Sequence, residues 1–294
     1  MGTFKNFAAR SKVATFAYRY AMGIHSRYQR AAVLSTDGPT FYKKHLWKRF
    51  SASDPAFEPV SLSPEFNAHL DRLGSHGITL IENRYAGLAR HLRGLLDDLG
   101  LTQFSHPEFV TDYCVDIGFV IPEVIQFFAD AELCGLLCNY YGRQAYYREH
   151  PFISAMSAKE GAIDLASHVH CDGYRQISLQ LLLNDIAAQD THLVYYGGSH
   201  REVKFDCERV PQTQDKVAGV EPILGIGKAG TLVAFDSGSG YHQGVYLSGQ
   251  RVCLVGMVTG GWLPFKDPKR KDSDAARALL KDRPTHVQRM FDRL

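Results

Sequence analysis

The spacing of hydrophobic residues predicts mainly helices in the first half of the chain. In residues 64–74, apolar side chains recur at helical spacing up to Gly74, which stands where a C-terminal cap would lie. Leucines form one stripe from Leu88 to Leu99, the clearest helix of the chain, and residues 122–141 contain a further helical region. Between the first two helices, residues 76–82 have the composition of a short strand.

From about residue 144 onward the hydrophobic pattern changes to alternation. Ile177, Leu179 and Leu181 alternate with the polar residues Ser178 and Gln180, as expected for a strand with one buried face. Glycine-rich breaks separate further short strands, which we expect over residues 193–196, 230–236, 241–247 and 251–258. This pattern predicts a mainly β fold with flanking α-helices. Its core would be a β-sandwich or a jelly roll, with the N-terminal helices covering one sheet.

Length and charge suggest how the chain is divided. Its 294 residues can form one large domain, and the 45% of hydrophobic and 22% of charged residues are ordinary for a globular protein. Residues 1–50 hold ten Lys or Arg and one acid, whereas the middle of the chain is acidic on balance. We therefore expect a basic N-terminal extension over residues 1–60, a jelly-roll domain over 61–265 and a polar, helical C-terminal tail over 266–294.

The basic N-terminus has neither the long apolar core nor the cleavage site of a secretory signal, and Asn6 stands where a myristoylation signal carries Ser or Thr. It predicts peripheral contact with an anionic membrane surface, with a transit peptide or a basic helix packed on the acidic domain as alternatives. No apolar stretch approaches the ~20 residues of a membrane span. We expect a cytoplasmic protein, in peripheral contact with a membrane at most, with a small-molecule substrate and no nucleic-acid partner.

The cysteines predict reduced thiols and no disulfide frame. The six cysteines contain no C-x-x-C pair and no zinc-ribbon spacing, and the chain is long enough to fold around its own core. This pattern is typical of a cytosolic protein.

His170, Asp172 and His242, followed by Arg251, form the candidate chemical site. Residues two apart on a strand project from the same face, so His170 and Asp172 can ligate one ion while Cys171 points away. Two histidines and one carboxylate can occupy one face of a divalent metal and leave the other face open, which suits Fe(II). An arginine nearby would anchor a dicarboxylate co-substrate through a bidentate pair.

A hairpin over residues 242–251 would bring these groups together. If Ser248-Gly249 is a two-residue turn, then Leu247 pairs with Gln250 and Tyr246 faces Arg251. His242 shares the face of Tyr246 and would lie roughly 13 Å from that pair, at about 3.3 Å per residue. A five-carbon dicarboxylate together with an arginine side chain spans about that gap.

Three stretches of the chain resemble the phytanoyl-CoA dioxygenase (PhyH) family of Fe(II)/2-oxoglutarate oxygenases. Ser167–Tyr174 resembles the first metal motif of that family, and Asp190–Arg201 its Gly-Ser-His segment, with Tyr196-Gly197 where the family usually has Ile-Pro. Gly230–Arg251 resembles the closing hairpin, and His76–Glu82 more distantly resembles the opening strand. The resemblance covers about residues 70–262.

This resemblance implies an oxidoreductase whose core is a double-stranded β-helix (jelly-roll, cupin-like) covered by N-terminal helices. By position, His170, Asp172 and His242 would be the iron ligands, and Arg251 would bind the distal carboxylate of 2-oxoglutarate. The reaction would consume O2, release succinate and CO2, and hydroxylate an unactivated C–H bond. Halogenating relatives replace the carboxylate ligand with a small residue, so Asp172 favours hydroxylation or a related oxidation.

Two further positions in the resembling stretches have structural alternatives. Thr191 stands where related oxygenases place a hydroxyl on the distal carboxylate, but a threonine after Asp190 can equally cap a turn. Ser199-His200 is expected to form a structural turn and not to ligate the metal.

Two other classes of protein compete with this interpretation. His168, His170 and Asp172 also fit the H-x-H-x-D pattern of a zinc-dependent hydrolase, although Gly173 stands where that pattern requires a histidine. A non-catalytic jelly-roll binding protein is the other alternative, which the full ligand set disfavours.

The residues around the first motif suggest the substrate. His168, Tyr174 and Arg175 are candidate substrate contacts, and Tyr147 and Arg148 are also expected at the pocket mouth. For His168 and Arg175, a surface position is the alternative. Together with the basic N-terminus, they indicate an anionic or lipid-linked substrate.

Overall fold

The computed structural model describes residues 54–104, 110–148, 151–159, 167–172, 176–201, 211–260 and 278–291. These residues all belong to one compact unit, Phe50–Leu294. The predicted extension over residues 1–60 falls largely outside the described ranges, and so does about half of the predicted tail over 266–294; both boundaries stay predictions. Along the described stretches, no helix has both the length and the apolar character needed to span a bilayer.

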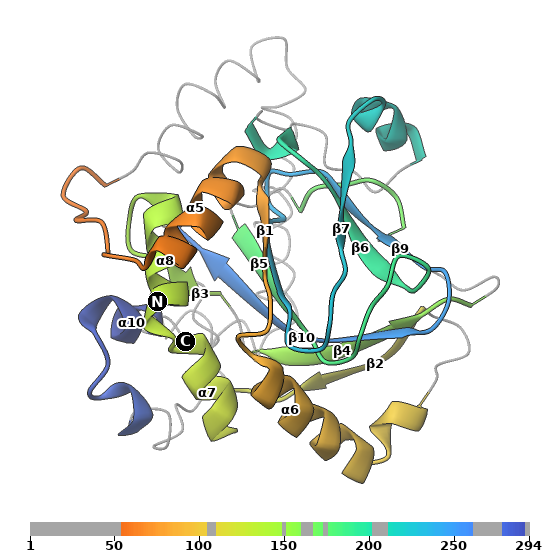
Figure 1. Ribbon diagram of the computed structural model, residues 1–294, viewed down its shortest axis with the longest axis horizontal. Helices are drawn as coiled ribbons and strands as arrows, with labels where there is room; N and C mark the ends of the chain where they lie inside the picture. Colours follow the sequence, from red (N-terminus) through yellow and green to blue (C-terminus); the bar gives the residue numbers. More distant parts are fainter. Residues whose placement is uncertain are drawn as a thin grey trace, which may run out of the picture. The chain divides into compact units, whose positions relative to one another are not determined.

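Two antiparallel sheets form the centre of this unit (Figure 1). The large sheet has the order β1 (Ile78–Ile81), β8 (Leu232–Asp236), β5 (Gln176–Leu182), β10 (Gln250–Thr259), β4 (Phe152–Ser157) and β2 (Thr111–Asp116), and β3 (Tyr146–Tyr147) also pairs with β10. The small sheet has the order β7 (Pro222–Gly225), β6 (His192–Tyr196) and β9 (His242–Val245). Leu193 and Tyr195 of the small sheet pack against Phe235 and Val255 of the large one. The predicted jelly-roll class is confirmed.

Helices cover the other face of the large sheet, as the sequence predicts (Figure 1). Their apolar side chains, such as Phe66 and Leu92, share one core with Leu179 and Leu254 of the sheet. The helices are α5 (Pro64–His76), α6 (Ala86–Asp98), α7 (Pro122–Phe128), α8 (Ala131–Tyr141) and α10 (Thr285–Met290), with short 3₁₀ turns at Leu101–Gln103, Ser199–Arg201 and Pro211–Val217.

One predicted helix boundary was wrong. Helix α5 continues past Gly74 to His76, and its cap is Gly77, which has a φ of 80° and donates its N–H to the carbonyl of Leu73. The helical region predicted over residues 122–141 is confirmed, and it consists of two helices. It breaks before α8, where the Asp130 carboxylate caps the next helix by accepting from two backbone N–H groups.

The prediction that strand β5 has one buried face was also wrong, because both of its faces are buried. Ile177, Leu179 and Leu181 face the helix-side core, whereas Ser178 and Gln180 face the space between the two sheets. The polar positions of the alternating pattern therefore line an internal cavity and do not face solvent.

The predicted hairpin between residues 242 and 251 is absent. Strand β9 pairs with β6 in the small sheet, whereas β10 pairs with β4 and β5 in the large one. The chain crosses between the sheets at Ser248, whose carbonyl accepts from the N–H of Thr191 at 2.8 Å. Leu247 therefore does not pair with Gln250, because this turn is tied to the loop that precedes β6.

The cysteines depart from the prediction at one position. Cys134, Cys138 and Cys253 are free and buried, as expected of reduced thiols. Cys171, in contrast, is disulfide-bonded. Sequence spacing shows local motifs only, and it does not show which distant thiols come within bonding range in the fold.

Candidate metal site

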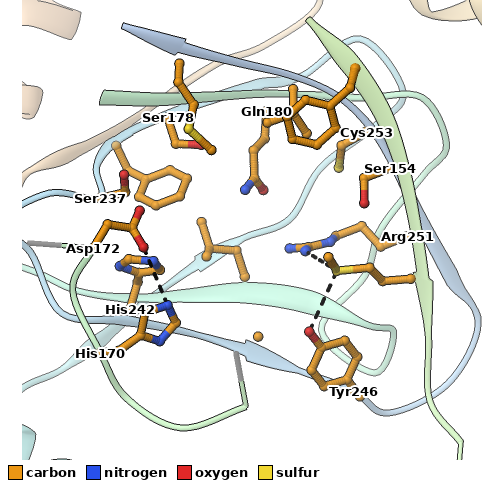
Figure 2. A pocket seen from close by; sticks show the side chains of 17 residues that line it. Ser154, His170, Asp172, Ser178, Gln180, Ser237, His242, Tyr246, Arg251 and Cys253 are labelled. Carbon is orange, nitrogen blue, oxygen red and sulfur yellow. Dashed lines mark hydrogen bonds and ion pairs between the residues drawn. The ribbon is translucent and has the colours of Figure 1, made fainter. Parts of the chain in front are cut away.

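A cavity of about 240 Å³ lies between the two sheets (Figure 2). Strands β4, β5 and β10 line it with alternate residues, among them Ser154, Gln180 and Cys253. Figure 2 shows His170, Asp172 and His242 gathered at one end and Arg251 at the other. The cavity thus has a cluster of metal-ligating side chains opposite a single cation.

The first cluster consists of three side chains that can each offer one ligand atom to a metal ion. These atoms of His170, Asp172 and His242 all lie within 4.8 Å of one another. An antiparallel backbone bridge joins the two histidines, with N–H to carbonyl distances of 2.9 and 2.8 Å. The bridge is the reason why residues far apart in sequence present their rings side by side, with centroids 4.3 Å apart.

The backbone fixes which ring nitrogen of each histidine is available. Nδ1 of His170 lies 2.7 Å from the carbonyl oxygen of His168, and Nδ1 of His242 lies 3.1 Å from that of Gly240. A carbonyl oxygen only accepts, so Nδ1 of each neutral ring carries the proton and Nε2 keeps its lone pair. Both histidines are therefore prepared to bind a metal through Nε2.

The carboxylate of Asp172 is oriented by its neighbours. The Asp172 N–H donates to the carbonyl of Ser237 at 2.8 Å, and Oδ2 accepts from Nε2 of Gln176 at 2.8 Å. Oδ1 lies 3.9 Å from Nε2 of His170. Gln176 was not singled out from the sequence, and its polar position on the alternating strand was the only signal for it.

Arg251 is a buried cation at the opposite end of the cavity. Its side chain is 7% exposed, and Nη2 contacts the sulfur of Met156 at 3.2 Å. Nη1 is buried and has no hydrogen-bond partner, and no carboxylate in the described part of the chain pairs with Arg251. A buried and unpaired guanidinium is costly, so this end of the cavity is suited to an anionic group of a ligand.

The cavity wall beside Arg251 carries a thiol that stays neutral. Burial raises the pKa of Cys253, and the charge of Arg251 opposes this only in part. The thiol is therefore protonated at neutral pH and acts as a small apolar wall residue, because only a thiolate would be a nucleophile or a good metal ligand.

The structure places Thr191 and the Gly-Ser-His turn outside the described cavity lining. The hydroxyl of Thr191 donates to the carbonyl of Gly249 at 3.2 Å, which is the turn-capping arrangement. Ser199 and His200 lie in a 3₁₀ turn, where the hydroxyl of Ser199 accepts from the N–H of Tyr241. His200 contacts the carbonyl of Gly74, so the turn ties α5 to the small sheet.

The predicted substrate contact His168 is half-buried, and its side chain is not among the cavity-lining residues. Its backbone carbonyl contacts Nδ1 of His170. Tyr174 and Arg175 lie outside the described residues. The expectation for Tyr147 was wrong, because it is buried in the helix-side core. Arg148 instead donates to Oε1 of Gln176.

The donor set fits Fe(II) better than a zinc hydrolase site. Two imidazole nitrogens and one carboxylate oxygen on one side leave several coordination positions open, which is the arrangement of non-haem Fe(II) sites. The ligand group found among the described residues does not include His168, so the H-x-H-x-D set of the hydrolase alternative is not assembled there.

Comparison with known proteins supports the fold. No family model and no curated protein matches the chain. Among solved structures, the epimerase SnoN from nogalamycin biosynthesis, in complex with Fe3+, alpha ketoglutarate and nogalamycin RO, has a TM-score of 0.54 and 13% identity, covering 66% of this chain and 83% of SnoN. EctD from S. alaskensis, with 2-oxoglutarate and 5-hydroxyectoine, has a TM-score of 0.52 and 18% identity, covering 82% of this chain and 91% of EctD.

The carbocyclase SnoK, also from nogalamycin biosynthesis, has a TM-score of 0.50 and 12% identity, covering 69% of this chain and 87% of SnoK. At these identities the likeness concerns the fold, and the narrower resemblance to phytanoyl-CoA dioxygenases stays a prediction. The chain has the fold of non-haem, 2-oxoglutarate-dependent enzymes.

Proposed function

We propose that this protein is a non-haem Fe(II)- and 2-oxoglutarate-dependent dioxygenase that hydroxylates an unactivated C–H bond of a small molecule. One observation carries the proposal. Two histidines and a carboxylate converge at one end of the cavity between the sheets, and an unpaired, buried arginine lies at the other. A dicarboxylate that chelates a metal at one end and meets a guanidinium at the other matches both features.

The residues divide the work as follows. Nε2 of His170, Nε2 of His242 and Oδ1 of Asp172 would hold the ion, because their other polar atoms are engaged with the protein. Arg251 would bind the distal carboxylate of 2-oxoglutarate with two parallel hydrogen bonds. When bound, the iron would supply the activation of O2 that is coupled to conversion of 2-oxoglutarate to succinate and CO2.

The walls of the cavity would protect this chemistry. Phe152, Leu193 and Val255 line the cavity together with the buried Cys253, so part of its wall is apolar. Apolar walls exclude water and restrict side reactions of a strong oxidant. Between the two ends, the amide of Gln180 points into the cavity (Figure 2) and is a polar group available to a ligand.

The fold alone does not determine the reaction type or the substrate. SnoN is described as an epimerase and SnoK as a carbocyclase, so this fold serves other outcomes besides hydroxylation. We favour hydroxylation because Asp172 supplies the carboxylate ligand. We also propose an anionic or lipid-linked substrate that contacts Tyr174, Arg175 or His168. The protein would be cytoplasmic, and its basic N-terminus would contact a membrane surface.

Anaerobic reconstitution with Fe(II) and 2-oxoglutarate tests the proposed function. We expect a visible metal-to-ligand charge-transfer band that is absent in His242→Ala and that requires higher concentrations of 2-oxoglutarate in Arg251→Ala. Candidate substrates are then screened in air for stimulated succinate formation, and with 18O2 for label in the product, which distinguishes hydroxylation from epimerisation or ring closure. Tight, stoichiometric zinc without such a band would instead favour the hydrolase.

A further inference from the structure

The two oxygens of the Asp172 carboxylate have different neighbours. Oδ1 lies on the side of the histidines, 3.9 Å from Nε2 of His170. Oδ2 accepts a 2.8 Å hydrogen bond from Nε2 of Gln176, whose amide also donates to the hydroxyl of Ser237 at 3.0 Å. Gln176 is 2% exposed. A buried amide therefore engages Oδ2, and Oδ1 is the oxygen that faces the two histidines.

The orientation of the Gln176 amide follows from both of its partners. Nη1 of Arg148 donates to Oε1 of Gln176. A guanidinium only donates and a carboxylate only accepts, so Oε1 must face Arg148 and Nε2 must face Asp172. The hydrogen bonds thus run from a cation through a neutral amide to an anion, and in a buried chain of this kind each bond polarises the next.

Gln176 and Arg148 both lie beside the backbone of the central strand β10. Gln176 lies opposite Thr259 of that strand, and its carbonyl accepts from the N–H of Gly238 at 3.1 Å. Arg148 follows β3, and its N–H donates to the carbonyl of Met257 at 2.8 Å. The amide is therefore held by the large sheet and not by a surface loop.

We propose that Gln176 and Arg148 are positioning residues that keep Asp172 a single-oxygen ligand of the metal. The inference rests on the proposed function, since it requires a metal between His170, Asp172 and His242. A carboxylate that binds through both oxygens would fill one more coordination position and close the one that dioxygen needs. Groups that orient a ligand in this way tune both the affinity and the geometry of a metal site.

Titration of the metal-free protein with Co2+, a redox-stable substitute for Fe(II), tests the inference. We expect Gln176→Met to weaken Co2+ binding by about 10–100-fold, because the Asp172 carboxylate is no longer held in its orientation. We also expect a change in the visible absorption of the bound ion, because Asp172 is released to bind through both oxygens. Arg148→Met should act in the same direction, and Arg148→Lys, which restores a donor to Oε1, should recover the wild-type spectrum.

Gln144→Met is the matched control. Gln144 is half-buried, and its amide donates to the carbonyls of Ala145 and His286 on the helix side. It should bind Co2+ like the wild type. A Gln176→Met protein with a lower melting temperature but wild-type Co2+ affinity and spectrum would overturn the inference.

Two further outcomes keep the test decisive. If Gln176→Met fails to fold, the Arg148→Met and Arg148→Lys pair gives the same comparison, and wild-type spectra in both would overturn the inference. A wild-type protein that binds no Co2+ would contradict the proposed function itself.

Discussion

His242 and Arg251 line one cavity from two different sheets. His242 begins β9 of the small sheet, and Arg251 is the second residue of β10 in the large one. The distance between a metal and a distal carboxylate is therefore set by how the two sheets pack and not by the register of one hairpin. Because His242 and Arg251 belong to different sheets, these two residues can be tested separately.

Substitution of Arg251 should weaken 2-oxoglutarate binding without removing the metal. Arg251→Ala should raise the dissociation constant of 2-oxoglutarate by about 10–150-fold, corresponding to about 1.5–3 kcal/mol for a charged hydrogen bond. The dissociation constant of Arg251→Lys should lie between those of the wild type and Arg251→Ala, because an ammonium keeps the charge but cannot form two parallel hydrogen bonds with a carboxylate. The charge-transfer band of the anaerobic Fe(II) protein measures the affinity.

Arg143→Ala is the control for this series, since Arg143 donates to the carbonyl of Gly260 and does not line the cavity. A wild-type affinity for 2-oxoglutarate in Arg251→Ala would assign the buried guanidinium to another ligand.

Loss of a ligand histidine should abolish metal binding, whereas loss of a similar buried histidine should not. His242→Ala should weaken Co2+ binding by more than the roughly 100-fold expected for groups behind the ligands. His192→Ala is the control, because His192 is 4% exposed and its Nδ1 also contacts a carbonyl two residues earlier, that of Asp190. Equal loss of metal in both variants would indicate a general disturbance of the small sheet.

The sequence was sufficient for those parts of the site that depend on local spacing. The pair His170 and Asp172 follows from the alternation of side chains in extended backbone, and the jelly-roll class follows from many short strands with glycine turns. The alternating pattern identified Ser178 and Gln180 as polar positions, but it did not show whether their side chains face solvent or a cavity. Alternation is the same whether the polar face meets water or an internal cavity.

The sequence was insufficient where distant segments decide the structure. Ser248-Gly249 has the composition of a hairpin turn, yet its hydrogen bonds to Gln189 and Thr191 direct the chain into the other sheet. Gln176 belongs to no motif, and only the fold brings its amide to Asp172. The same holds for the disulfide of Cys171.

Thr191 offers a direct test between the turn and the co-substrate. Its hydroxyl donates to the carbonyl of Gly249, so Thr191→Val should lower the free energy of unfolding by about 0.5–1.5 kcal/mol, measured by denaturant titration. The dissociation constant of 2-oxoglutarate should stay at the wild-type value. A loss of affinity comparable to that of Arg251→Ala would instead support a place for Thr191 on the distal carboxylate.

His69 should make the protein sensitive to mild acid. It is 8% exposed, and its Nδ1 lies 2.8 Å from the hydroxyl of Thr79, linking α5 to β1. Burial, and next the charge of Arg72, lower the pKa of His69, although Glu65 opposes them. The unfolded chain, with a histidine pKa of about 6.5, therefore takes up this proton at higher pH than the folded one.

The stability from His69 is thus complete above about pH 6.5 and is lost as the pH falls from there to the folded-state pKa. The free energy of unfolding of the metal-free protein should decline over this range, and His69→Gln, which has no titrating proton, should reduce the decline. Denaturant titrations at a series of pH values measure both curves, and their difference isolates His69 from the other histidines. Parallel curves for the two proteins would show that His69 does not couple folding to pH.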